Sequence, residues 1–128
     1  MKIDRIDHVV LTVADIDATV AFYTEVMGMT AQTFAGRRHA LAFGRQKINL
    51  HQQGKEFEPK SHRPTAGSGD LCFIAETALD EVIAHLKTCG VEILQGPVER
   101  TGAIGTLRSV YFRDPDLNLI EVSNYVNA

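Results

Sequence analysis

Cysteine is scarce in this chain, since Cys72 and Cys89 are the only two among its 128 residues. Small secreted domains that depend on disulfide bonds usually carry a larger, even-numbered set. Both cysteines also stand in apolar or helical sequence surroundings. We therefore expect reduced thiols and a cytoplasmic location.

Long apolar runs and a strong charge of one sign are also missing. Charged residues interrupt the N-terminal segment at Asp4, Arg5 and Asp7, and no stretch approaches the length that spans a bilayer. The net charge of −3 provides no basic surface of the kind that nucleic acids or anionic membranes require. We expect no export signal, no membrane anchor and no nucleic-acid partner. A small anionic ligand would depend on local arginine or lysine residues.

The sequence does contain an ordered series of predicted elements. The β-branched run at 6–13 predicts a strand, and Asp15 predicts the N-cap of a helix that stops at Gly28. Three short alternating runs then predict strands, near 29–34, 38–43 and 47–51.

The polar segment 52–69 divides the chain near its middle. It holds two prolines and three glycines without periodicity, which predicts a linker or a binding loop. Beyond it the order of elements repeats, with a predicted strand at 70–75, a helix at 79–89, and strands at 91–94, 107–113 and 117–125. The glycine-containing insertion 95–105 is expected to form a mobile flap.

A single offset of 62 residues supports the repeat, because it relates Gly28 to Gly90 and His8 to Asp70. A hydrophobic content of 45% over 128 residues fits one compact domain. We therefore predict an α+β fold in a single domain, 1–128. Two βαβββ modules, at about 1–52 and 69–128, would pair to form a cleft.

Four polar side chains stand at strand positions where apolar packing is expected, namely His8, His51, Asp70 and Glu121. A buried carboxylate needs a charge partner, and imidazole with carboxylate ligands suits divalent Zn, Ni, Mn or Fe. Each residue also has an ordinary structural interpretation. His8 would be a hydrogen-bonded core residue, and His51 would cap a strand. Asp70 would cap a turn, and Glu121 would be a salt-bridged edge residue.

Residues 7–13, 21–29 and 112–121 together resemble the vicinal-oxygen-chelate superfamily of glyoxalases, bleomycin-resistance proteins and extradiol dioxygenases. The resemblance covers essentially the whole chain. It is closest to the glyoxalase-domain-containing protein 5 group, through the segments 47–51, 55–60 and 96–103. The resemblance implies paired βαβββ modules, a divalent metal ion at the base of the cleft, and usually a homodimer.

In the superfamily, the metal ligands come from the first and last strands of each module. His8 and Glu121 match the first and fourth ligand positions, and Asp70 stands at the third, which is commonly His. At the second position, alignment of the two last strands puts Asn49 in register with Glu121. Asn is a poor ligand for transition metals, so we predict that His51, on the same strand face, is the ligand instead.

The resemblance implies a metal-dependent lyase or isomerase, similar to lactoylglutathione lyase, acting on a small substrate chelated through vicinal oxygens. The metal would stabilise an enediolate, and Glu121 or Asp70 would move the proton. Arg100 is the candidate substrate-binding residue. Two alternatives are an extradiol-type dioxygenase, with Fe(II) on His8, His51 and Glu121, and a non-enzymatic ligand-binding or resistance module without metal.

Overall fold

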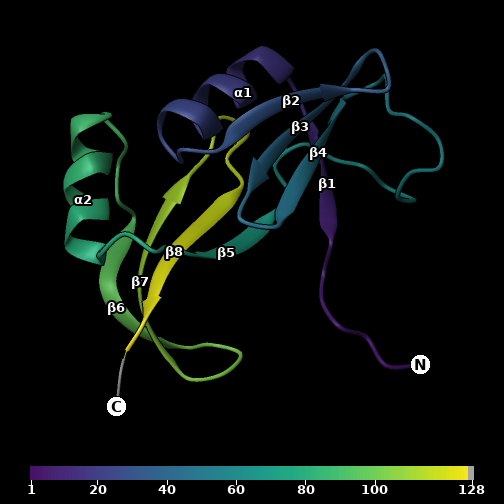
Figure 1. The fold of residues 1–128 in the computed structure, drawn as a ribbon. Helices are drawn as coiled ribbons and strands as arrows, with labels where there is room; N and C mark the ends of the chain where they lie inside the picture. Colours follow the sequence, from purple (N-terminus) through teal and green to yellow (C-terminus); the bar gives the residue numbers. More distant parts are fainter. Residues whose placement is uncertain (127–128) are drawn as a thin grey trace. The chain divides into compact units, whose positions relative to one another are not determined.

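The computed structural model of the chain describes residues 1–126. It divides into two compact units, Met1–Gly67 and Ser68–Ala128. Each unit has the element order β-α-β-β-β and one four-stranded sheet (Figure 1). The predicted α+β fold with two βαβββ modules is confirmed.

The first unit packs one helix against its sheet. Its elements are β1 (His8–Val13), α1 (Ile16–Glu25), β2 (Thr30–Phe34), β3 (Arg38–Phe43) and β4 (Gln46–Gln52). The strand order is β1-β4-β3-β2, in which only β1 and β4 are parallel. Helix α1 contacts β2, β3 and β4. Leu41, Ile48 and Tyr23 are fully buried and belong to the core of this unit.

Helix α1 begins where the sequence predicts. The Asp15 side chain accepts a hydrogen bond from the Ala18 backbone N–H at 3.2 Å, which satisfies one of the free donors of the first turn. Gly28 follows the helix with φ +73°, a left-handed conformation that glycine adopts at little cost. Gly90 has the same φ after the second helix.

The second unit repeats this arrangement. Its elements are β5 (Asp70–Ile74), α2 (Leu79–Thr88), β6 (Gln95–Thr101), β7 (Thr106–Arg113) and β8 (Leu119–Tyr125), with strand order β5-β8-β7-β6. Helix α2 contacts β7 and β8, and Leu86, Phe112 and Ile120 are buried. Within residues 1–126, no helix is long and apolar enough to cross a membrane.

Strand β6 corrects two predictions. Residues 91–94 form no strand, and the strand lies instead inside the predicted flap. Pro97 argued against a strand here, because proline cannot donate a backbone hydrogen bond to a sheet. However, β6 is an edge strand, where the loss of one donor is tolerated. Gly96 has φ +117°, and a Cβ there would collide with the Ser109 carbonyl oxygen. Only residues 102–105 remain irregular between β6 and β7.

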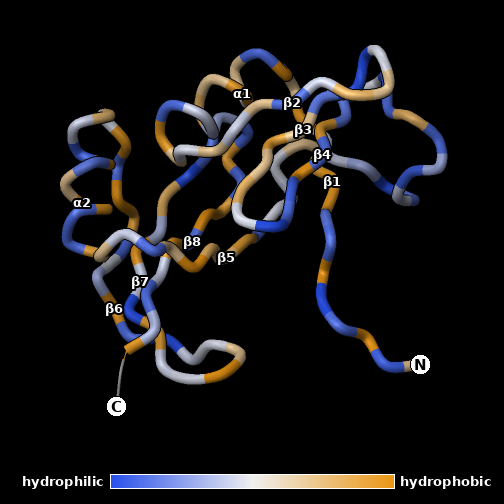
Figure 2. The backbone as a smooth tube through the Cα atoms, viewed as in Figure 1, coloured by the Kyte–Doolittle hydropathy of each residue, from blue (hydrophilic) through white to orange (hydrophobic). Residues whose placement is uncertain are grey.

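The segment between β4 and β5 contains no helix or strand, which confirms the predicted loop. It is mostly hydrophilic (Figure 2). Four of its residues belong to the pocket described below.

Candidate functional site

Each sheet has a face that carries its helix and an opposite face, which we call the open face. In the first unit the pairing of β1 with β4 sets His8 beside Lys47 and Thr12 beside His51. Side chains alternate along a strand, so Asn49 shares the open face with these four. On the helix side, Gln52 accepts a hydrogen bond from the Ile16 N–H at the start of α1.

His8 lies at the start of β1 with a side chain that is 43% exposed. Its Nδ1 is 2.9 Å from Asp7 Oδ2, and this hydrogen bond is the main cause that lowers the pKa of Asp7. When the neutral ring donates from Nδ1 to a carboxylate, Nε2 keeps its lone pair. Carboxylates orient metal-binding histidines in this way, so His8 is suited to binding a cation through Nε2.

His51 is buried, with 3% exposure, and contacts Arg38. Arg38 Nη2 lies 3.3 Å from His51 Nε2. Since a guanidinium only donates, Nε2 is the acceptor and the proton of the neutral ring is on Nδ1. Burial, followed by the charge of Arg38, lowers the pKa of His51.

The strand register separates His51 from His8. His51 lies four residues beyond Lys47, the partner of His8, which corresponds to roughly 13 Å along the strand. Asn49 lies only two residues beyond, and its buried Oδ1 has no hydrogen-bond partner among the described residues. The assignment of His51 as a metal ligand stays a prediction, and its contact in this structure is with Arg38.

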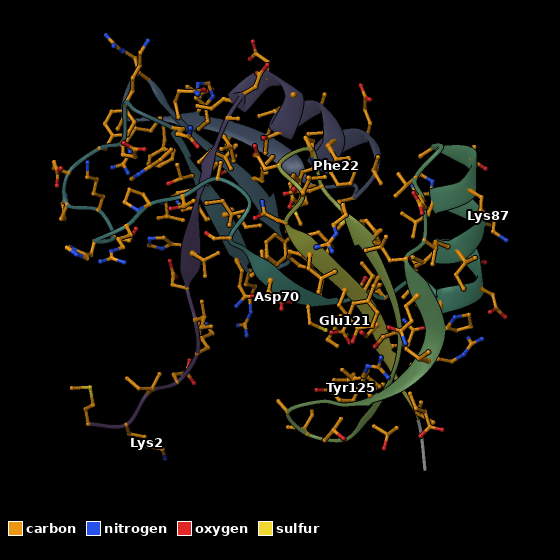
Figure 3. The ribbon with its side chains drawn as sticks, turned by 180° about the vertical axis from the view of Figure 1, so that it is seen from behind. Lys2, Phe22, Asp70, Lys87, Glu121 and Tyr125 are labelled. Atoms are coloured by element: carbon orange, nitrogen blue, oxygen red, sulfur yellow. The ribbon has the colours of Figure 1, made fainter. Side chains whose placement is uncertain are left out.

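Asp70 and Glu121 lie on neighbouring strands of the second unit (Figure 3). The register sets Cys72 beside Glu121 and Asp70 beside Leu119, so the two carboxylates share the open face with an offset of two residues. Asn118 Oδ1 accepts from the Gly69 N–H at 2.7 Å, which positions the start of β5.

Asp114 in turn holds Asn118. Its Oδ1 accepts from the Asn118 N–H at 2.9 Å, and its Oδ2 accepts from Asn118 Nδ2 at 2.8 Å. Both residues are buried. The Asp-Pro-Asp-Leu-Asn stretch that supported the family resemblance therefore has a structural role, which is to fix the loop before β8 and the start of β5.

Two serine hydroxyl groups contact one oxygen of the Glu121 carboxylate. Ser109 Oγ donates to Glu121 Oε2 at 2.7 Å, Ser123 Oγ donates to the same oxygen at 3.3 Å, and the two hydroxyls lie 2.6 Å apart. Both serines are fully buried. Tyr111 stands directly opposite Glu121 on β7. Burial raises the pKa of Tyr111, the hydrogen bond from Arg100 opposes this rise, and the charge of Glu121 adds to it.

Sequence reasoning missed these hydroxyl residues. Their only signal is the presence of Ser109 and Ser123 in otherwise apolar, alternating strands. Their link to Glu121 depends on how β7 pairs with β8.

Arg100, the predicted substrate-binding residue, is exposed on β6. Its Nε donates to the Tyr111 hydroxyl at 3.0 Å, and its Nη1 donates to the Glu99 carbonyl at 2.9 Å. Arg100 is thus connected through Tyr111 to Glu121 within the second unit. A role in substrate binding stays a prediction.

The first unit contains a pocket of about 400 Å³ between its open face and the loop that follows β4. Its lining residues are Val10, Thr12, His51, Pro59, Lys60, Ser61 and Pro64. The loop therefore lines a cavity large enough for a small molecule, as expected of a binding loop.

The predicted metal ligands are divided between the units, two in each. Within either unit, the described residues bring no three His, Cys, Asp or Glu side chains together at metal-binding distance. The complete four-residue set stays a prediction.

Comparison with known proteins gives a family match over most of the chain. The sequence model described as "Glyoxalase/Bleomycin resistance protein/Dioxygenase superfamily" matches residues 5–122. The "Virulence protein STM3117" of Salmonella typhimurium is 60% identical over 126 residues, which cover 98% of this chain and 88% of the relative. Its crystal structure matches with a TM-score of 0.97, covering 98% of this chain and 100% of that chain.

Two further relatives are similar to the chain over most of its length. The "Glyoxalase domain-containing protein RDO1" of Mycosarcoma maydis is 49% identical over 128 residues, covering 100% of this chain and 72% of the relative. The "Metallothiol transferase FosB" of Shouchella clausii is 31% identical over 122 residues, covering 94% and 80%.

Proposed function

Since the chain belongs to the Glyoxalase/Bleomycin resistance protein/Dioxygenase superfamily, we propose that it is a metal-dependent lyase or isomerase of the glyoxalase type. Its substrate would be a small molecule that binds through two adjacent oxygens. The observation that carries the proposal is Glu121, a carboxylate held on the open face by two buried serines. Such a network orients a functional carboxylate.

The residues proposed as metal ligands are His8, Asp70 and Glu121. One imidazole nitrogen and two carboxylates suit Zn, Ni, Mn or Fe(II). Asp7 orients the His8 ring, and Ser109 and Ser123 orient Glu121. When bound, the cation supplies a Lewis acid that stabilises developing negative charge. The FosB relative, a metallothiol transferase by name, supports the metal requirement.

The protein side chains provide the proton transfer. In the proposed reaction, Glu121 or Asp70 takes a proton from the substrate carbon and returns it to the neighbouring carbon. Tyr111 and Arg100 lie next to Glu121 and bind the substrate on that side. The membership of the glyoxalase-domain-containing protein 5 group, the homodimer and the cytoplasmic location belong to this proposal.

The dioxygenase alternative is less well supported. It needs two histidines and one carboxylate on iron, and the second histidine would be His51. In this structure His51 Nε2 accepts a hydrogen bond from Arg38. Ligation through that nitrogen would require Arg38 to move away.

Metal analysis of protein purified without added metal tests the proposal. We expect bound Zn, Ni or Mn in the wild type, and Glu121→Gln and His8→Gln should each weaken metal affinity by more than about 100-fold, since removing a ligand costs more than removing its support. His39→Gln is the matched control, because His39 pairs with Leu50 and faces the helix side.

The reaction itself is tested with a glutathione hemithioacetal in D₂O. Deuterium incorporation by the metal-loaded wild type supports the lyase or isomerase. Iron with oxygen consumption on a catechol, or unchanged metal occupancy in Glu121→Gln, contradicts the proposal.

A further inference from the structure

Two positive side chains on the open face of the first unit have no carboxylate within ion-pair distance among residues 1–126, namely Arg38 and Lys47. Both are half-buried. Arg38 Cζ lies 5.4 Å and Lys47 Nζ 4.0 Å from the centre of the Phe34 ring, and Arg38 Cζ is 4.7 Å from the centre of the Phe57 ring. Aromatic rings attract cations without neutralising them. Lys47 acts on the Asp7 carboxylate from beyond ion-pair distance. Arg38 contacts two aromatic rings and an imidazole in partly desolvated surroundings.

The pocket of the first unit adjoins Arg38, because His51 both lines the pocket and accepts the Arg38 hydrogen bond. Its polar lining residues are Thr12, Ser61, His51 and Lys60. No carboxylate lines it. A volume of about 400 Å³ is within the range of small-molecule sites.

Lys60 lines this pocket and lies within ion-pair distance of two glutamates. Its Nζ lies 3.4 Å from Glu58 Oε1 and 3.9 Å from Glu56 Oε1. The Glu58 side chain is 73% exposed, and ion pairs in such places contribute little. The Glu56 side chain is only 8% exposed and its charge also acts on His51, so Glu56 offsets part of the positive charge beside the pocket. A ligand anion that enters the pocket competes with both Glu58 and Glu56 for the Lys60 ammonium group.

We infer that this pocket is an anion subsite that takes the carboxylate or phosphate group of a small molecule. Lys60 and the hydroxyls of Thr12 and Ser61 contact the anion. Arg38 fixes the His51 ring by the Nε2 hydrogen bond, and its positive charge attracts the anion from outside the pocket lining. This inference assigns His51 to anion recognition, as an alternative to its predicted role as a metal ligand. The inference deepens the proposed function, since it rests on that function for identifying the bound molecule as a substrate.

The test uses the full chain after treatment with a chelator, so that no metal contributes. Inorganic phosphate and, separately, acetate are titrated at constant ionic strength against chloride, with calorimetry and the His51 ring resonances as readouts. We expect saturable binding of at least one of the two anions. The anion that binds more tightly identifies the group for which the pocket is built. The inference is overturned if neither anion binds better than chloride.

Variants locate the binding. Lys60→Met and Arg38→Met should each weaken the affinity by about tenfold or more, as expected for a lost charge-assisted bond, whereas Lys60→Arg retains most of it. Lys55→Met is the matched control, because Lys55 lies in the same loop outside the pocket lining. Thermal unfolding of each variant confirms that it is folded. An equal loss in Lys55→Met and Lys60→Met would indicate non-specific charge attraction and overturn the subsite.

Glu121→Gln separates this inference from the proposed function. The anion affinity of this variant should equal that of the wild type even when its metal affinity is lost. Anion binding in a wild-type protein that takes up no metal would refute the proposed function alone. Metal binding without anion binding would refute the subsite alone.

Discussion

The two units share their element order and strand order, but the chemistry of their open faces differs. The register makes Asn49 of β4 equivalent to Glu121 of β8. Asn49 pairs with the residue two positions after His8, and Glu121 pairs with the residue two positions after Asp70. One strand further, Ala40 stands opposite Asn49, and Tyr111 stands opposite Glu121. An amide beside a small apolar side chain in one unit thus corresponds to a carboxylate beside a phenol in the other.

The open faces also differ two residues further along β4 and β8, at His51 and Ser123. At this position His51 contacts Arg38 in the first unit, and Ser123 contacts Ser109 in the second unit. By contrast, the helix sides remain alike, with Ile48 and Leu50 matched by Ile120 and Val122, all buried. Packing against a helix constrains one face of each sheet to apolar residues. The other face is free to acquire cations in one unit and a carboxylate network in the other.

The largest change in unfolding free energy is expected from a substitution in β6, the edge strand of the second unit. A Cβ on Gly96 would collide with the Ser109 carbonyl oxygen and lie 2.9 Å from Val110 Cα. Because backbone atoms cannot move aside cheaply, Gly96→Ala should lower the free energy of unfolding by about 3 kcal/mol.

Gly28→Ala and Gly90→Ala are the matched controls, since no atom lies within 4 Å of either Cβ position. Their left-handed backbone alone should cost about 1 kcal/mol. Chemical denaturation of the three variants compares them. Equal losses would mean that β6 relaxes around the new methyl group.

An intermediate effect is expected at the helix starts, which the units cap differently. Asp15 caps α1 from the adjacent position. No side chain caps α2 at Ala78, and Asn124 of β8 instead accepts from the Leu79 N–H at 2.7 Å and donates to the Ala75 and Thr77 carbonyls.

Asn124→Ala should therefore cost about 2 kcal/mol and Asp15→Ala about 1 kcal/mol, because the first removes three hydrogen bonds and the second removes one. Thermal unfolding monitored by calorimetry measures both changes. A larger loss in Asp15→Ala would show that Asn124 does not act as the cap of α2.

The smallest effect concerns the pH dependence of stability. The pKa of His51 is lowered in the folded state from 6.5, so the unfolded chain binds a proton more readily at this residue. Stability is therefore full above about pH 6.5 and falls as the pH drops below it. His51→Gln should reduce the slope of unfolding free energy against pH between about pH 7 and 5.

Arg38→Met should reduce the same slope in part, because the charge of Arg38 is the second cause of the shift. Ser123→Ala, at the equivalent position of the second unit, should leave it unchanged. Urea denaturation at several pH values measures the slope. An unchanged slope in His51→Gln would show that His51 does not govern this titration.

Much of the fold was predictable because local signals and tertiary packing agree. The predicted strand 38–43 coincides with β3, and Asp15 caps α1 as its side-chain chemistry requires. Strand β6 was missed because Pro97 is unfavourable within a strand until the strand is known to lie at an edge. Whether a strand lies at an edge depends on pairing with residues distant in the chain.

The candidate site was predictable to a smaller extent. His8, Asp70 and Glu121 were recognisable because burying a polar or charged side chain in an apolar strand costs free energy unless it has a partner. Their partners did not stand out, since Ser109 contacts Glu121 only through the pairing of β7 with β8. His51 matched a ligand by residue type, while its contact with Arg38 follows from the pairing of β3 with β4.

The sequence by itself determined the order of helices and strands, their duplication at an offset of 62 residues, and the apolar face of each sheet. These features depend on short-range periodicity and on capping chemistry. Only the tertiary structure decided which polar side chains meet. A shift of one residue in strand register moves every side chain to the other face, and long-range pairing sets that register.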